Sequence, residues 1–215
     1  LGLLPWSVVA GLVAVGSISM TLYVMHARRT GSPVLDFSLL RLSTMRASII
    51  GGFLFRLGIG ALPFLLPLLM QEGFGLSPFH SGLVTFASAV GAMGMKTLAA
   101  RIIRTFGFRN LMTVNAIVSS VFLAACALFT VTTPLLLIFI ILVVGGFFRS
   151  LQFTAINTVA YAEVEPAQMS RATTLVSVNQ QLAISAGVAV GAFCVESTML
   201  MRHVTELSAA DFGPA

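Results

Sequence analysis

Three basic residues, Arg56, Lys96 and Arg149, lie inside long runs of apolar residues, where charges are rarely found. In a membrane, a charged side chain near the bilayer centre costs at least about 2.5–3.5 kcal/mol. Residues of this kind normally face a cavity, a partner side chain or a bound molecule, and an arginine can hold a carboxylate through paired hydrogen bonds. The three positions therefore predict a site whose chemistry is binding by buried positive charge.

Arg56 lies about eight residues into its apolar run, or roughly 12 Å at 1.5 Å per residue, close to the middle of a membrane. Gly52 and Gly60 flank it at i−4 and i+4, on a stripe of small residues that favours contact between helices. Pro63 and Pro67 follow and should kink this helix. Arg56 therefore either faces a cavity or bonds carbonyl groups that the kink frees.

Lys96 has two possible roles. It is nearer the end of its run, and its long stem could carry the ammonium group to the lipid headgroups. Ala92 and Ala99 share its helix face, which indicates packing against another helix instead. Both roles stay open, and Lys96 is kept in the predicted site.

Arg149 begins a stripe of polar residues, with Gln152 at i+3 and Asn157 at i+8 on roughly the same helix face. A later run carries a second stripe at i+3 and i+4 spacing: Thr174, Ser177, Gln181 and Ser185. Hydrogen bonds between helices would explain any one of these residues. Two stripes in one bundle favour a polar-lined cavity, and its predicted lining is Arg56, Lys96, Arg149, Gln152, Asn157 and Gln181.

Groups that could perform catalysis or carry a proton are missing from the apolar runs. The acidic residues all lie in predicted loops or near run ends: Asp36, Glu72, Glu163, Glu165, Glu196, Glu206 and Asp211. No histidine lies in mid-membrane, and Cys126 and Cys194 have no metal-ligand spacing. We expect no enzyme activity, catalytic residue, metal or cofactor. A proton-carrying carboxylate would belong to a part of the protein outside this sequence.

Membrane-spanning helices must position these residues. Of 215 residues, 57% are hydrophobic and 9% are charged, whereas a soluble domain has about a quarter charged. The long apolar runs argue against the alternating segments of a membrane β-barrel and favour helices of about 20 residues. We predict an all-α integral membrane protein with six transmembrane helices, at about residues 4–26, 48–71, 80–104, 111–131, 134–160 and 172–198.

Lysine and arginine concentrate in alternate connections, which is the pattern of the positive-inside rule. Connections 27–47, 101–110 and 161–171 should therefore be cytoplasmic. The N-terminal end and the 199–215 tail should lie outside the cytoplasm. The formal net charge of +5 is divided among these connections and forms no single basic face, so we expect no nucleic-acid partner.

Five segments carry a family resemblance: PVLDFSLL at 33–40, FRLGIGALPF at 55–64, GLSPFHSGL at 75–83, GMK at 94–96 and the span from Arg171 to Gly191. Together they resemble the fourteen-span drug:proton antiporters of the major facilitator superfamily, over about residues 1–200. Arg56 and Lys96 match basic positions of bacterial multidrug-resistance permeases in that family. One loop motif of the superfamily is incomplete here, because Arg104 stands where an acid is expected.

The resemblance implies part of a C-terminal bundle. It divides the chain into a linker helix at 1–27, a cytoplasmic loop at 28–47, five bundle helices at 48–198 and an extracytoplasmic tail at 199–215. The N-terminal bundle and the last helix would lie outside this sequence, which begins without methionine. The resemblance also implies alternating access in the bacterial inner membrane, with the substrate site between two bundles.

We therefore expect part of a proton-coupled exporter of drugs or small organic molecules. Its partners would be the lipid bilayer, a small-molecule substrate and the N-terminal bundle of the same protein. An exporter of small organic anions is the alternative that buried arginine and lysine favour. A membrane scaffold or receptor without transport is a further alternative, and it would have a packed core without a water-filled path.

Overall fold

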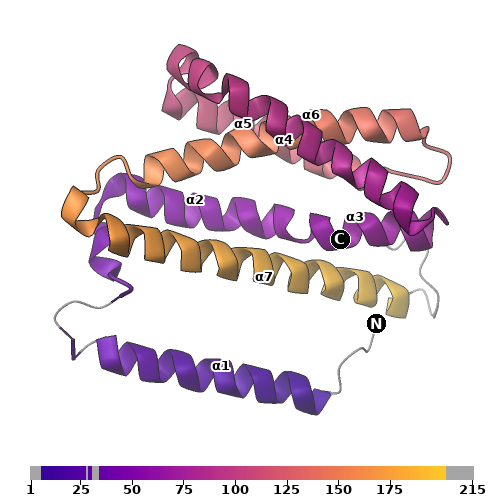
Figure 1. The fold of residues 1–215 in the computed structure, drawn as a ribbon. Helices are drawn as coiled ribbons and strands as arrows, with labels where there is room; N and C mark the ends of the chain where they lie inside the picture. Colours follow the sequence, from indigo (N-terminus) through magenta and orange to yellow (C-terminus); the bar gives the residue numbers. More distant parts are fainter. Residues whose placement is uncertain (1–5, 28, 31–33, 202–215) are drawn as a thin grey trace.

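The computed structural model describes residues 6–27, 29–30 and 34–201, which form helices and no strand (Figure 1). The long helices are α1 (Trp6–Ala27), α2 (Ser43–Gly60), α4 (Pro78–Phe106), α5 (Phe108–Cys126), α6 (Leu135–Ala160) and α7 (Met169–Met201). The short ones are η1 (Phe37–Arg41), α3 (Leu62–Leu68), η2 (Leu69–Gly73) and η3 (Pro166–Gln168). The predicted all-α membrane class is confirmed.

Five helical stretches of this part of the chain are long and apolar enough to cross a membrane. They are Ser7–Ala27, Ser43–Gly73, Pro78–Ala99, Leu135–Ala160 and Pro166–Met199. The sequence predicts a sixth span up to residue 131, but α5 ends at Cys126, where turn hydrogen bonds from Ala127 and Leu128 replace the helical ones. Its 19 residues reach about 28 Å, close to the roughly 30 Å of a bilayer core.

The span that carries Arg56 is broken in its second half, as its two prolines predict. Helix α2 ends at Gly60 and α3 begins at Leu62, with Pro63 in its first turn and Pro67 inside it. A proline has no N–H to donate and its ring clashes with the preceding turn, so regular hydrogen bonding cannot pass through this stretch. The carbonyl of Pro67 instead accepts a hydrogen bond of 3.3 Å from the Ser81 hydroxyl of α4.

Glycines bring two pairs of helices into backbone contact. A Cβ atom at Gly91 of α4 would overlap the Val143 carbonyl of α6, and one at Gly146 would overlap the Ser88 carbonyl. Helices α2 and α7 meet in the same way, because a Cβ at Gly187 would overlap the Leu57 carbonyl. Small residues allow such close approach in membranes. Gly187 and Gly191, spaced by four on α7, therefore form a packing motif against α2 and α3.

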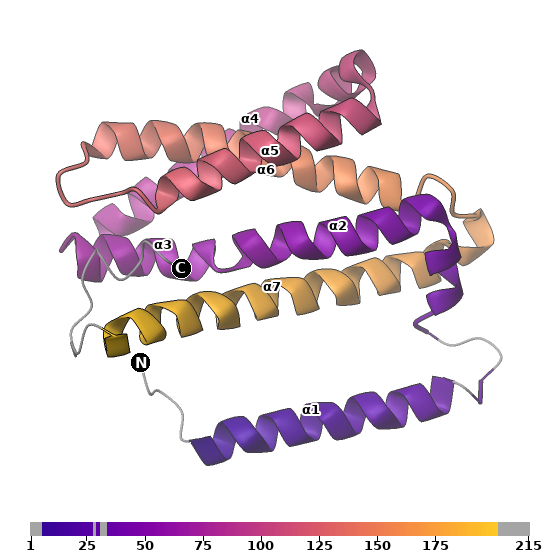
Figure 2. The ribbon, with the colours of Figure 1, turned by 180° about the vertical axis from the view of Figure 1, so that it is seen from behind.

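The connections alternate between the two ends of the bundle (Figures 1 and 2). The α1–α2 connection, the α4–α5 turn and the α6–α7 turn lie together at one end. The η2–α4 turn and the α5–α6 connection lie at the opposite end, with the C-terminal end of α7. This is the alternation on which the predicted orientation depends, with the connections rich in arginine at one end.

Helix α1 stands apart from the other helices in both views, and most of its described side chains are exposed. The segment that follows it is docked more firmly. Leu39 of η1 is buried with residues of α2, α6 and α7 in a small core: Met45, Ala160, Val164, Ala172, Leu175 and Val176. The arginine-rich end of the bundle therefore has a core of its own.

The contact between α4 and α6 gives the first testable prediction. Gly91→Ala should destabilise the full-length protein by about 1–3 kcal/mol, because its Cβ must push against the backbone of α6. Gly94→Ala is the matched control, since a Cβ at Gly94 meets no atom within 4 Å. Thermal unfolding in detergent measures both, and an equal melting temperature for the two variants would contradict the close packing.

Candidate functional site

The break between α2 and α3 borders a cavity of about 460 Å³. The cavity is lined from four spans: Ile59, Gly60, Leu62, Pro63, Leu66, Pro67, Gly82, Thr85, Phe86, Ser88, Arg149 and Ile184. Its volume falls within the roughly 300–1,000 Å³ of small-molecule sites, and it has their usual mostly apolar wall with a few polar groups. We take this cavity as the candidate site.

The polar groups of the cavity come from α4 and α6. The hydroxyls of Thr85 and Ser88 each donate to a carbonyl three residues earlier in α4, at 3.1 Å in both cases. Their oxygen lone pairs stay available to accept hydrogen bonds from a ligand. Arg149 of α6 is the charged residue of the lining, so the cavity offers one cation and two acceptors against apolar walls.

Arg149 has no carboxylate partner in the described part of the chain, where the one ion pair joins Arg171 to Asp36. It also makes no hydrogen bond to another described residue. The guanidinium further lines a smaller cavity of about 20 Å³ with Ser119 and Cys126. The Ser119 hydroxyl is buried without a hydrogen-bond partner. A cavity of this size with polar groups can hold about one water molecule, which could hydrogen-bond to both side chains.

Arg56 lies between α2 and α6, only 1% exposed. Its Nη2 donates a hydrogen bond of 2.8 Å to Oδ1 of Asn157, and its guanidinium carbon lies 5.0 Å from the centre of the Phe153 ring. A Cβ at Gly52 would lie 2.6 Å from Nη1, so this glycine leaves the space that the guanidinium fills. Neither Arg56 nor Asn157 is among the residues that line the candidate cavity.

Gln152 is buried at the contact of α6 with α5. Its Oε1 accepts a hydrogen bond of 2.8 Å from Nδ2 of Asn115, and its Nε2 donates to the Met112 carbonyl at 3.3 Å. The same Asn115 amide also donates to the Phe148 carbonyl at 2.9 Å. These bonds join α5 to α6, and Gln152 also lines a separate cavity of about 340 Å³ between α2, α5 and α6. Its role in binding therefore stays a prediction.

The three residues of the predicted α6 stripe therefore point to three neighbours: Arg149 to the cavity, Gln152 to α5 and Asn157 to α2. The geometry of a helix explains this divergence. Positions i+3 and i+8 fall on opposite sides of position i and are about 140° apart. Polar residues that seem to share one helix face in the sequence therefore contact three different neighbours in the packed bundle.

Lys96 and Gln181 are exposed on α4 and α7. Beside Lys96, Met95 and Ala99 are buried, at 0% and 8% exposure, so the lysine lies outside the contact that its helix makes. On α7, the buried polar contact comes from Asn179, whose Nδ2 donates to the Ile49 carbonyl at 3.1 Å. The structure therefore does not bring Lys96 and Gln181 together with Arg149, and their role in binding stays a prediction.

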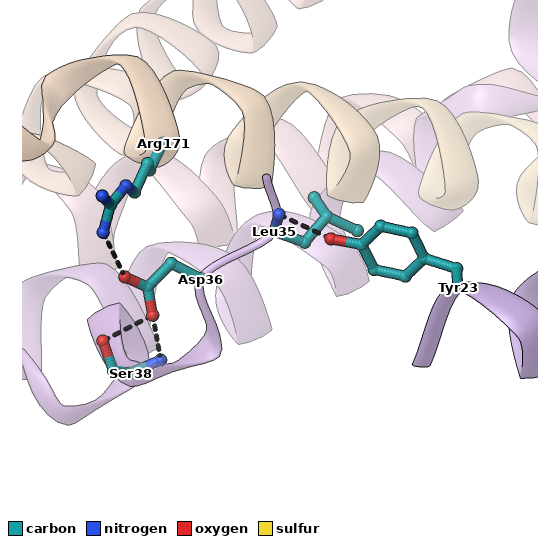
Figure 3. A network of polar contacts seen from close by, with 5 residues as sticks. All are labelled: Tyr23, Leu35, Asp36, Ser38 and Arg171. Carbon is teal, nitrogen blue, oxygen red and sulfur yellow. Dashed lines mark hydrogen bonds and ion pairs between the residues drawn. The ribbon is translucent and has the colours of Figure 1, made fainter. Parts of the chain in front are cut away.

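A second polar cluster fastens the segment after α1 to the bundle (Figure 3). Asp36 accepts hydrogen bonds from the amide and hydroxyl of Ser38, and its other oxygen lies 3.3 Å from Nη1 of Arg171. The Leu35 amide donates to the Tyr23 hydroxyl at 2.7 Å. The hydrogen bonds from Ser38, with a smaller contribution from Arg171, lower the pKa of Asp36 below its ordinary value. Asp36 is thus ionised at neutral pH.

Glu163 has a comparable role at the start of α2. Its carboxylate accepts hydrogen bonds from the Ser43 hydroxyl at 3.1 Å and the Thr44 amide at 3.3 Å. It supplies the cap that Leu42, the residue before this helix, cannot provide. The bond from the Thr44 amide is the largest cause of a lowered pKa for Glu163. Asp36 and Glu163 both lie in predicted loops, and nothing in the sequence pattern indicated these contacts.

Other residues of the site were missed because their signals are weak in a sequence. Asn115 and Ser119 are spaced by four on α5 and are the buried polar residues of that helix, so their spacing could have indicated a polar face toward α6. Phe153 lies four residues before Asn157 and shares its face, but aromatic residues are common in membrane helices. Thr85 and Ser88 resemble ordinary packing residues until the adjacent cavity is known.

Comparison with known proteins gives a match to one protein family. The family model described as Major Facilitator Superfamily matches residues 48–199. Among curated proteins, the chain is 32% identical over 194 residues to proteins named "Putative multidrug resistance protein MdtD" from Salmonella heidelberg (strain SL476) and Salmonella typhi. Each alignment covers 88% of this chain and 40% of the relative. The chain therefore spans well under half the length of these relatives.

The contact between Arg56 and Asn157 generates the second prediction. Asn157→Ala should destabilise the full-length protein by about 1.5–3 kcal/mol, because it removes a hydrogen bond to a buried charged group. In a background carrying Arg56→Met, the same Asn157→Ala change should cost much less, since no charge remains. Thermal or denaturant unfolding of the four proteins gives the coupling energy. A coupling near zero would show that the hydrogen bond contributes nothing.

The ion pair between Asp36 and Arg171 generates the third prediction. A carboxylate with a lowered pKa stabilises the docked segment above the ordinary pKa of about 3.9, and this contribution is lost as pH falls through the lowered value. The distance between spin labels at Leu22 of α1 and Val178 of α7 should therefore stay constant between about pH 5 and 8. Asp36→Asn should broaden that distance at every pH, whereas a broadening in the unaltered protein at pH 6 would contradict this account.

Proposed function

The chain belongs to the major facilitator superfamily, and from this we propose that it forms part of the C-terminal half of a secondary active exporter of small organic molecules. The candidate cavity carries the proposal. It lies beside a proline-broken span, it has the volume of a small-molecule site, and Arg149 supplies a charge to it. Drugs are one substrate class in view, because the relatives bear the words multidrug resistance in their names.

Proton coupling and alternating access complete this proposal. A second bundle of the same protein would close the other side of the cavity, with the bilayer around both. Lys96 and Gln181 are exposed on α4 and α7, and we propose that they face that second bundle. The proton would be carried by a carboxylate outside this chain, because the acids of its spans lie near the ends of the apolar runs.

The broken span supports a role in conformational change. Its final turn, η2, is a π-helix that begins two residues after Pro67. Helix irregularities of this kind are frequent at functional sites, because they leave backbone groups free and weaken the helix locally. We propose that the α2–α3 junction bends when the cavity opens and closes. The tightly packed contacts of α4 with α6 would move as one unit.

Small organic anions are a second candidate class of substrate, and Arg149 favours it. A guanidinium without a carboxylate partner in an apolar site is best satisfied by a ligand that brings the negative charge. The hydroxyls of Thr85 and Ser88 could accept hydrogen bonds from hydroxyl groups of the same ligand. A scaffold without transport is not favoured, because the chain belongs to a transporter superfamily.

The chain is a multi-pass membrane protein, and we propose the bacterial inner membrane as its location. The bacterial relatives support this proposal. The arginine-rich end of the bundle would then face the cytoplasm, because positively charged connections are retained on that side.

Arg149 separates the two substrate classes in a transport assay on the full-length protein. Arg149→Gln should reduce export of a carboxylate substrate about tenfold or more, since a hydrogen bond to a charged group contributes about 1.5–3 kcal/mol. Export of a cationic dye should be unchanged or improved. Arg149→Lys should retain part of the carboxylate export because it keeps the charge.

Arg46→Gln is the matched control for that assay, because Arg46 is exposed in the first turn of α2, away from the cavity. It should leave export of both substrates intact. If Arg149→Gln impaired dye and carboxylate export equally, Arg149 would be a structural residue and the anion candidate would be wrong. If no small molecule were exported by the full-length protein, the proposed function itself would fail.

A further inference from the structure

Between Gly73 and Ala162 the sequence contains no acidic residue, although it contains five basic ones: Lys96, Arg101, Arg104, Arg109 and Arg149. Arg101 and Arg104 lie in the last two turns of α4 and are exposed. Neither forms an ion pair within the described residues. The α4–α5 end of the bundle thus carries positive charge that the described chain does not balance.

A crevice of about 410 Å³ lies at this same end, between α4, α5 and α6. Its exposed walls include Phe106 and Val114, at 63% and 61% exposure, and its floor is the buried pair Leu111 and Leu151. Helix α4 contributes Ile102 and Phe106 to its lining, and Arg101 and Arg104 belong to the same two turns of that helix. An apolar crevice and two free cations therefore lie within one or two helical turns of each other.

The turn between the two helices adds a further site for negative charge. Gly107 has a positive φ of 70°, which lets α5 start immediately after α4 ends. Helix α5 has no side-chain cap and no acid in its first turn, and its hydrogen bonding begins with Leu111 donating to the Gly107 carbonyl. The amides before Leu111 and the helix dipole favour an anion at this position.

We propose that this crevice binds an anionic phospholipid. One acyl chain lies along Phe106 and Val114, and the phosphate lies against Arg101, Arg104 and the first turn of α5. This arrangement balances the unpaired charge and fills the apolar crevice with one molecule. Basic pockets between transmembrane helices on the cytoplasmic side recognise lipid headgroups in this way. The site is separate from the candidate cavity, which lies beside α3.

A negative net charge on the lipid is part of the proposal. A zwitterionic headgroup brings its own cation, which two arginines and a helix N-terminus would repel. The arginine-rich end of the bundle is also the end that the positive-inside rule places in the cytoplasm. There the membrane surface is negatively charged through its anionic lipids.

Native mass spectrometry of the full-length protein tests the charge preference. Phosphatidylglycerol and phosphatidylcholine with identical acyl chains are added to delipidated protein, and the apparent affinity of the first bound lipid is measured. Phosphatidylglycerol should bind several-fold more tightly. Arg101→Gln with Arg104→Gln should weaken it roughly tenfold or more, at about 1 kcal/mol per arginine. Equal binding of the two lipids would overturn the proposal.

The double variant needs two controls. Arg41→Gln with Arg46→Gln removes the same charge from exposed positions at the same end of the bundle, away from the crevice. It should leave phosphatidylglycerol binding unchanged, and an equal loss would show attraction to overall charge rather than a site. Arg101→Lys with Arg104→Lys keeps the charge and should retain the lipid preference, which excludes a simple failure to fold.

The crevice is tested separately with a bulky side chain. Val114→Trp fills the crevice and should weaken phosphatidylglycerol binding several-fold. Ile117→Trp is the matched control, because Ile117 lies on the same helix with 62% exposure against 61% for Val114, and it is not among the crevice residues. If Val114→Trp bound the lipid as well as Ile117→Trp, the acyl chain would lie elsewhere and the proposed site would be wrong.

Discussion

The guanidinium of Arg56 lies in the interior of the bundle with an amide, an aromatic ring and a glycine around it, and no carboxylate among the described residues. It is 1% exposed and its Nε has no hydrogen-bond partner, so the Asn157 amide and the Phe153 ring are what stabilise its charge. That requirement fixes how α2 lies against α6. A rotation of either helix by one residue, about 100°, would carry Asn157 away from Nη2 and leave the charge unpaired.

Two features of the helices account for the candidate cavity: the glycine contacts and the proline break. Gly91 and Gly146 allow the backbones of α4 and α6 to touch, and Gly187 allows the same contact between α7 and α2. Backbones that touch in this way cannot separate to fill space elsewhere. At Pro63 and Pro67 the second span loses its regular hydrogen bonding, and α2 gives way to α3 beside the cavity. The candidate cavity therefore lies at the proline break, beside helices that are tightly packed at their glycines.

The sequence was sufficient for the helices and for the reasons they meet. Apolar run length located the spans, and proline chemistry located the break in the second span. The sequence did not predict which neighbouring helix each polar side chain contacts. Gln152 and Asn157 diverge because residues on one apparent stripe face different neighbours once the helices cross. The length of α5 was also overestimated, because apolar turn residues after Cys126 look like helix in composition.

Charged side chains are paired at one end of the described bundle and unpaired beside the candidate cavity. Acidic residues that find partners, such as Asp36 and Glu163, do so at the arginine-rich end of the bundle, through Arg171, a hydroxyl or a helix N-terminus. Arg149 has no equivalent partner within the described chain, so the cavity wall carries an unpaired cation. A cation kept free in an apolar wall remains able to exchange ligands. The cost of leaving it unpaired is compatible with a stable bundle when water or a ligand reaches it.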